Sequence, residues 1–277
     1  MLNKEKKIKK ILKKIYKNKI VVGHSNSSRN PKMAKFILFK NKQFDIINPF
    51  KILKYKKKAQ KFLKECASIG GIILYVGTKK QIKFIVEKYA KKVKMPFINY
   101  KWPAGLLTNI KNTRLSIKKK NILETQKKTI YKYLSKKEKL FMNRKYDKIN
   151  KKFGTIFNMN RLPMAIIIVD VKKEHIAVKE AFKTSIYTIG IVDTDSSPQY
   201  IDYPIPANDD LSKSINYILK GLTRSIIKGL KERKLNLKKE KNKLFLKKDE
   251  DKLNLKKDED KLNLKKDEDK LNLKKDE

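Results

Sequence analysis

Continuous apolar runs and helix-spaced apolar positions alternate along most of the chain. IILYVG (72–77), AIIIVD (165–170) and YTIGIVD (187–193) are apolar at nearly every position, and PFINY (96–100) is a shorter run of the same kind. Runs of this length are typical of strands buried on both faces of a parallel sheet. FILFKNKQFDIIN (36–48) instead predicts two short strands around a polar turn.

The segments between these runs have apolar residues at three- and four-residue spacing, which predicts helices. Residues that favour helix ends bound several of them: Pro49 and Thr78 at two starts, Gly70 after one end, and Asn208 or Asp209 before the last helix. The alternation predicts an α/β fold with a parallel sheet and helices on both faces. The expected helices cover residues 8–15, 49–69, about 78–92, about 174–182 and about 208–231.

Residues 111–152 interrupt this alternation. The segment has helical spacing and no strand pattern, and it breaks only near Tyr133–Ser135. We therefore expect two antiparallel helices of about 15 to 20 residues each. The segment contains 16 Lys plus Arg against three acidic residues, a net charge of +13. Because a hairpin that is only solvated would balance its charges, this excess indicates an anionic partner.

From residue 235 onward the chain repeats a nine-residue unit, most clearly LNLKKDEDK. In a helix a step of nine residues turns successive leucine pairs to opposite faces, so they form no single apolar stripe. The pattern predicts a disordered low-complexity tail over residues 235–277. Its 15 Lys nearly match its 12 acidic residues, so most of the formal charge of +44 belongs to residues 1–234.

Composition narrows the class of protein. The single Cys66 excludes an intramolecular disulfide, and its place in an apolar helical pattern indicates a core residue rather than a reactive thiol. No run of 18 apolar residues is present, so no transmembrane helix is expected. The charge of +44 favours nucleic acid as the partner, with an anionic membrane surface second. A lysine-rich composition could also reflect an AT-rich genome.

VGTKKQ (76–81) follows a predicted strand and resembles a phosphate loop, because backbone amides at a helix start would lie beside Lys79 and Lys80. It lacks the glycine density of a Walker A or GxGxxG sequence. The competing interpretation is a capped helix whose lysines face RNA, and it is the one favoured here.

Three aspartates, Asp170, Asp193 and Asp195, lie at predicted strand ends, where α/β folds place their sites. Clustered carboxylates there could hold Mg²⁺, but no nucleophile or base lies beside them, and helix capping is the favoured interpretation. His24 and His175 have no Cys or acidic partner at ligand spacing. No zinc site is therefore predicted.

Five segments, taken together and in order, resemble the bacterial and organellar small-subunit ribosomal protein S-two family. They are GHSNSSRNPKM (23–33), GGIILYVGTKKQ (70–81), NYKWPAGLLTNIKNTR (99–114), LPMAIIIVDVKKEHIAVKEA (162–181) and IVDTDSSPQYIDYPIPANDD (191–210). The resemblance implies a flavodoxin-like parallel sheet with a protruding coiled-coil hairpin. It also implies a non-enzymatic ribosomal component that binds small-subunit rRNA and neighbouring ribosomal proteins, including the mRNA-binding protein S-one. The competing hypothesis is a flavodoxin-like enzyme that binds a phosphate or a nucleotide.

The combined prediction divides the chain into three parts. Residues 1–110 and 153–234 form the flavodoxin-like α/β domain, residues 111–152 the inserted hairpin, and residues 235–277 the tail. No cofactor, metal, membrane contact or small-molecule substrate is expected. The protein is expected on the ribosome in the cytoplasm, or in an organellar matrix or stroma if an organelle encodes it.

Trp102 is the only tryptophan, and it lies just before the hairpin. Packing at the base of the hairpin is favoured over stacking on a base, because buried aromatic side chains commonly fix the orientation of elements. The candidate rRNA-binding residues are polar or cationic and follow from charge, position and resemblance: His24, Arg29, Lys32, Lys79, Lys80, Asn109, Lys111, Arg114, Lys118 and Lys119.

Overall fold

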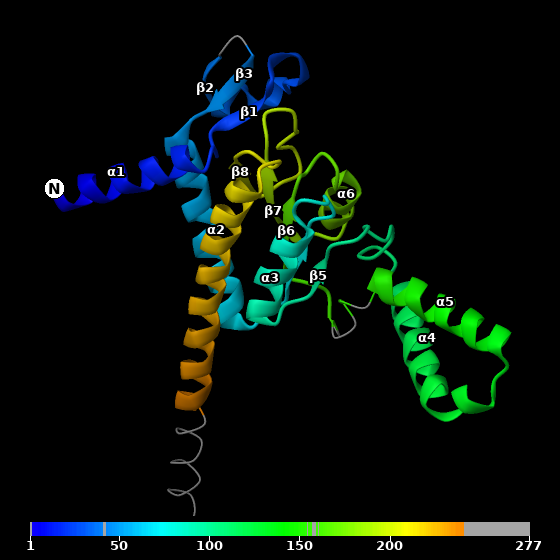
Figure 1. The fold of residues 1–277 in the computed structure, drawn as a ribbon. Coiled ribbons are helices and arrows are strands. Elements are labelled where there is room, and N and C mark those ends of the chain that lie inside the picture. The colour runs from blue at the N-terminus through cyan, green and yellow to red at the C-terminus, as the bar shows by residue number, and fades with distance from the viewer. Residues whose placement is uncertain (1, 41–42, 154, 157–158, 160, 241–277) are drawn as a thin grey trace, which may run out of the picture. The chain divides into compact units, whose positions relative to one another are not determined.

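The computed structural model describes residues 2–40, 43–153, 155–156, 159 and 161–240. The chain divides into two units, residues 1–230 and residues 231–277. All strands and all helices with labels lie in the first unit (Figure 1). No helix in the described part of the chain is long and apolar enough to cross a bilayer.

A five-stranded sheet forms the centre of the first unit, and its strands follow the order β5-β4-β6-β7-β8. Every neighbouring pair in this sheet is parallel, as the buried apolar runs predict. The strands are β4 (Ile73–Val76), β5 (Phe97–Ile98), β6 (Ala165–Val169), β7 (Tyr187–Val192) and β8 (Tyr203–Pro206).

Successive residues of one strand point to opposite faces, so the sheet separates two apolar cores. Ile73 and Tyr75 of β4 lie in the core beneath α2 (Pro49–Ile69), α3 (Lys83–Val93) and the helix of residues 212–230. Leu74 and Val76 lie in the core beneath α6 (His175–Lys183) and the loop that contains Trp102. Helices therefore cover both faces, which is the flavodoxin-like α/β arrangement predicted (Figure 1).

Helix ends follow the predicted residues with one exception. Asn48 caps α2 by accepting the backbone N–H groups of Phe50 and Lys51, and Gly70 ends it in the left-handed region with φ 90°. Asn208 accepts two backbone N–H groups ahead of the last helix. Thr78 caps no helix, because its hydroxyl donates to Glu174, and α3 starts only at Lys83.

The N-terminal region adds a helix and a small antiparallel sheet. α1 (Leu2–Lys17) buries Ile15 in the core beneath α2, and the sheet follows the order β1-β3-β2. β2 (Ile37–Lys40) and β3 (Phe44–Ile47) are the strand pair predicted from 36–48, whereas β1 (Val22–Ser25) was not predicted. Two short 3₁₀ helices, η1 (Asn26–Ser28) and η2 (Pro31–Phe36), lie between β1 and β2.

The basic insertion is a helical hairpin, as predicted. α4 (Ile110–Thr129) and α5 (Lys136–Phe153) flank η3 (Tyr131–Tyr133), close to the expected break. Ser135 and Glu138 form a reciprocal cap at the start of α5, in which the Ser135 N–H donates to the Glu138 carboxylate over 2.9 Å. Tyr146 donates to Glu124 over 2.9 Å and joins the two helices.

Two further expectations concern Cys66 and the C-terminal tail. Cys66 is buried, and burial raises the pKa of its thiol to about 11, so it is the inert core residue predicted. Residues 235–240, which the prediction placed in a disordered tail, are helical. The rest of that tail, residues 241–277, lies outside the described residues.

Candidate functional site

Polar side chains gather at the edge of the sheet where the parallel strands end. Lys79 follows β4, Asp170 follows β6, and Asp209 and Asp210 follow β8. The Lys79 Nζ lies 2.8 Å from Asp170 Oδ2, 3.3 Å from Asp209 Oδ1 and 2.7 Å from Asp210 Oδ1. Partial burial opposes the charge of Lys79, but hydrogen bonds to Asp170 and Asp210 outweigh it and raise its pKa above the usual value.

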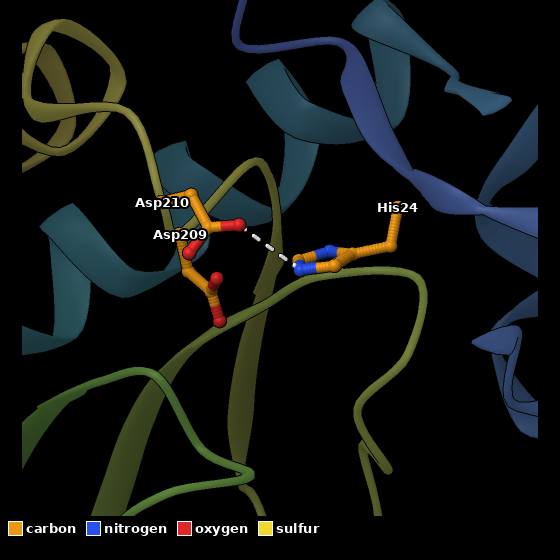
Figure 2. A group of neighbouring side chains, drawn as sticks. All are labelled: His24, Asp209 and Asp210. Atoms are coloured by element: carbon orange, nitrogen blue, oxygen red, sulfur yellow. Dashed lines mark ion pairs between the residues drawn. The ribbon is translucent and has the colours of Figure 1, made fainter.

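His24 supplies a second cation to the same group of carboxylates. Its Nδ1 lies 3.1 Å from Asp193 Oδ2. Its Nε2 lies 3.0 Å from Asp210 Oδ2, the ion pair drawn in Figure 2. The hydrogen bond to Asp193 is the largest influence, and it raises the pKa of His24 to about 9. His24 has no acidic residue at ligand spacing in the sequence, and the acidic partners that it has in the structure lie 169 or more residues away along the chain.

The carboxylates of this cluster differ in how readily they ionise. Burial and the neighbouring charges of Asp193 and Asp170 raise the pKa of Asp209 to about 8. Asp195 lies nearer solvent, and Lys172 Nζ contacts it over 2.8 Å. The cluster is therefore a network of ion pairs in which Lys79, His24 and Lys172 offset part of the acidic charge of five aspartates.

The predicted roles of the aspartates are partly observed. Asp170 Oδ1 accepts the backbone N–H of Lys173 over 3.0 Å in the turn before α6, as a capping residue would. Asp193 instead holds His24 and accepts the N–H of Asp209. One ligand atom from each of His24, Asp209 and Asp210 lies within 4.8 Å of the others, so these are the described residues that could hold a metal ion (Figure 2).

The segment VGTKKQ does not have the geometry of a phosphate loop. Residues 79–82 form a turn rather than the first turn of a helix, and α3 starts after them. The ammonium of Lys79 is already shared among three carboxylates, while the adjacent Lys80 is exposed. A phosphorylated ligand would find neither a free helix N-terminus nor an available Lys79.

Trp102 is buried, with only 6% of its surface exposed, and it packs in the core beneath α6. Its indole N–H donates to Glu180 Oε1 over 3.1 Å. The same carboxylate accepts the N–H of Gly105 over 2.7 Å and the N–H of Leu107 over 3.1 Å. Glu180 therefore holds the loop that leads into α4.

Sequence reasoning did not find Glu180. The sequence does contain an indication of its role, because Ala177 and Ala181 place Glu180 on the buried face of α6, where an acidic residue needs partners. The partners themselves, 73 to 78 residues away along the chain, could not be read from the sequence.

Of the ten candidate rRNA-binding residues, five make contacts within the fold that are described first, and the other five are exposed. His24 and Lys79 belong to the sheet-edge cluster, Arg29 Nη1 lies 3.5 Å from Asp45 Oδ1, and Lys32 hydrogen-bonds Gln199. Asn109 caps α4 by accepting the N–H of Asn112 over 3.2 Å. The remaining candidates are all exposed: Lys80, Lys111, Arg114, Lys118 and Lys119. Of these, only Arg114 has an interaction within the described residues.

The chain matches the family model described as ribosomal protein S2 over residues 15–229. It is 51% identical to the small ribosomal subunit protein uS2 of Karelsulcia muelleri over 206 residues, which is 74% of this chain and 93% of the relative. The protein of the same name from Flavobacterium johnsoniae is 44% identical over 76% of this chain and 84% of the relative. The matched region contains the sheet, the sheet-edge cluster and the hairpin, so the chain belongs to the ribosomal protein S2 family.

Proposed function

We propose that this protein is a structural, non-enzymatic component of the small ribosomal subunit that holds small-subunit rRNA through its basic helical hairpin. The work of the protein is positioning: several dispersed lysines each contact a phosphate, and the sheet fixes the base of the hairpin. RNA double helices are bound mainly through phosphate and 2′-hydroxyl groups, which suits a lysine surface. Neighbouring ribosomal proteins are the second class of partner.

The charge of the hairpin carries this proposal. Residues 111–152 contain 16 Lys plus Arg and three acidic residues. On α4, Lys111, Lys118 and Lys119 are exposed and have no ion pair with any residue that the structure describes. α5 buries none of its described side chains. Because a hairpin with little core exposes so many unmatched cations, a polyanion is the partner that its chemistry fits.

The competing hypothesis, an enzyme that binds a phosphate or a nucleotide, lacks support. Its candidate groups are the lysine and aspartates of the sheet edge, and they are bound to one another. A nucleophile or general base must reach its substrate, and in this cluster each described carboxylate already contacts Lys79, His24 or Lys172.

Two finer parts of the proposal rest on the family resemblance and the relatives. The mRNA-binding ribosomal protein S-one is a proposed neighbour, because family members help to recruit it. The proposed location is the cytoplasm of a bacterium, with the protein bound to the ribosome. The bacterial origin of the relatives named above supports this location over an organelle.

The test has two arms. In the first, lysate is sedimented through a sucrose gradient, and the protein is expected in the small-subunit fraction. In the second, the full chain with Lys111, Lys118 and Lys119 changed to Glu is titrated with small-subunit rRNA, and affinity is expected to fall more than tenfold. The matched control changes Lys61, Lys179 and Lys183, exposed lysines on α2 and α6, to Glu. Equal losses in the two variants, or absence from ribosomal particles, would refute the proposal.

A further inference from the structure

A cleft of about 700 Å³ lies between α1, α2 and the helix of residues 212–230, away from the sheet-edge cluster and the hairpin. Seven of the residues that line it are Lys or Arg, and none is Asp or Glu. All three helices contribute cations, among them Lys14 of α1, Lys56 of α2 and Arg224 of the last helix. Such a concentration of one charge in a concave site attracts anions.

Lys56 is the unusual member of this group. It is only 7% exposed, and its Nζ lies 3.4 Å from the carbonyl oxygen of Tyr217 and 3.7 Å from the centre of the Tyr217 ring. No carboxylate pairs with it in the part of the chain that the structure describes. Burial, and then the charge of Arg224, lower the pKa of Lys56 to about 8. A buried ammonium with a cationic neighbour is therefore left without an anion.

The packing around Lys56 depends on its side chain. A Cβ atom at Gly221 would lie 2.6 Å from Lys56 Cε and 3.0 Å from its Nζ, so a larger residue there would force the end of the Lys56 side chain to move. Gln60 donates to the Gly221 carbonyl over 2.8 Å and holds the two helices at this separation. A glycine inside a helix lowers the stability of the helix by roughly 1 kcal/mol relative to alanine. The close contact with Lys56 explains why a glycine stands at this position despite that cost.

We infer that this cleft is a second phosphate-binding site, which takes the phosphodiester backbone of rRNA at a place separate from the hairpin. The inference rests on the proposed function, since rRNA is the polyanion it supplies. A phosphate offers several acceptor oxygens, which match ammonium groups from α1, α2 and the last helix at once. Its charge compensates the buried Lys56 and the exposed Arg224, which no described carboxylate does.

The competing explanation is that Lys56 only packs, with its methylene groups buried along α2 and its ammonium over Tyr217. The two explanations make opposite statements about Lys56→Met, which keeps an unbranched apolar side chain and removes the charge. If Lys56 binds phosphate, the variant loses rRNA affinity while its thermal midpoint stays equal or rises. If Lys56 only packs, the midpoint falls and rRNA affinity does not change.

The experiment uses the full chain and small-subunit rRNA purified from Flavobacterium johnsoniae. Affinity is measured at several KCl concentrations for wild type, Lys56→Met and Lys61→Met, a change of an exposed lysine on the same helix. For Lys56→Met we expect a several-fold weaker complex and a log–log salt slope shallower by about one. Lys61→Met should bind as the wild type does. Wild-type affinity and slope in Lys56→Met would overturn the inference.

Two further arms keep the outcomes distinct. If Lys56→Met does not fold, Arg224→Gln tests the same cleft at an exposed residue, and unchanged binding there overturns the inference. If the hairpin variant loses affinity and both cleft variants bind normally, the proposed function stands and this inference fails. Inorganic phosphate that stabilises the wild type and competes with rRNA supports the site. Phosphate that stabilises without competing assigns the cleft to a free anion and overturns the rRNA assignment.

Discussion

A single substitution of Glu180 should loosen the attachment of the hairpin base to the sheet domain, because its carboxylate holds the loop that leads into α4. It accepts three N–H groups, from Trp102, Gly105 and Leu107, and it is 7% exposed. Changing Glu180 to Ala removes every one of these acceptors and leaves three buried or half-buried donors. Nothing else in α6 can replace the lost oxygens, since its neighbouring positions on that face are Ala177 and Ala181.

The magnitude follows from the number of orphaned donors. A buried donor without a partner costs about 1–3 kcal/mol, and hydrogen bonds to a charged acceptor lie at the upper end. Three donors give roughly 3–9 kcal/mol, from which the relief of no longer burying the Glu180 carboxylate is subtracted. We expect Glu180→Ala to lower the free energy of unfolding by about 3–5 kcal/mol. Glu180→Gln keeps one acceptor oxygen and should lose about half as much.

Trp102 makes the assay specific, because it is the only tryptophan and itself one of the donors. Urea unfolding is followed by tryptophan fluorescence for the loop and by circular dichroism for the whole chain. Glu180→Ala should shift the native emission to longer wavelength, since water reaches the indole. Glu65→Ala, an exposed glutamate on α2, is the control and should change stability by less than about 0.5 kcal/mol. Equal stabilities and an unchanged emission in the Glu180 variant would refute the reasoning.

Three other substitutions test the sheet edge and the helix packing. The raised pKa of His24 means that its stabilisation is complete below its usual 6.5 and is lost as pH rises through about 9. Unfolding free energy should therefore fall across that window more steeply in wild type than in His24→Asn, in which the raised pKa of Asp209, about 8, still contributes a smaller fall. Lys79→Met leaves three carboxylates facing one another and should cost about 3–5 kcal/mol at pH 7 by thermal denaturation, with partial recovery at pH 5; equal losses at both pH values would contradict this. Gly229→Ala places a Cβ 2.2 Å from the Lys64 carbonyl oxygen and should lower the thermal midpoint by several degrees, whereas an unchanged midpoint would show that the helices can separate freely.

The sheet was largely predictable, because strands buried on both faces need apolar residues at every position and so stand out in the sequence. β8 was missed since YPIP contains two prolines, which remove backbone donors and argue against a strand. Its place at the edge of the sheet explains why the prolines are tolerated, and only the strand order reveals that place. Residues 111–152 stood out in the sequence because helix spacing and charge changed together, and the helices α4 and α5 lie between Ile110 and Phe153.

The sheet-edge cluster was predictable only in part. Aspartates after strands pointed to the correct edge of the sheet, since parallel strands end together. Lys79 and His24 were predicted to contact rRNA from charge, position and resemblance, and the number of carboxylates around each depends on segments far away in sequence. Pairing of this kind is decided by tertiary structure, and periodicity along the chain contains no information on it.

The distribution of acidic residues connects the fold with the proposed partner. Residues 1–234 contain only 16 Asp plus Glu, and five of them lie in the sheet-edge cluster. Two more, Glu174 and Glu180, are buried and hydrogen-bonded to Thr78 and to the Trp102 loop. Carboxylates that hold strand ends and loops together cannot also neutralise lysines on the helices. The surface cations are therefore left for an external anion because the interior uses so many of the acids, and a ribose-phosphate chain offers that charge at regular spacing.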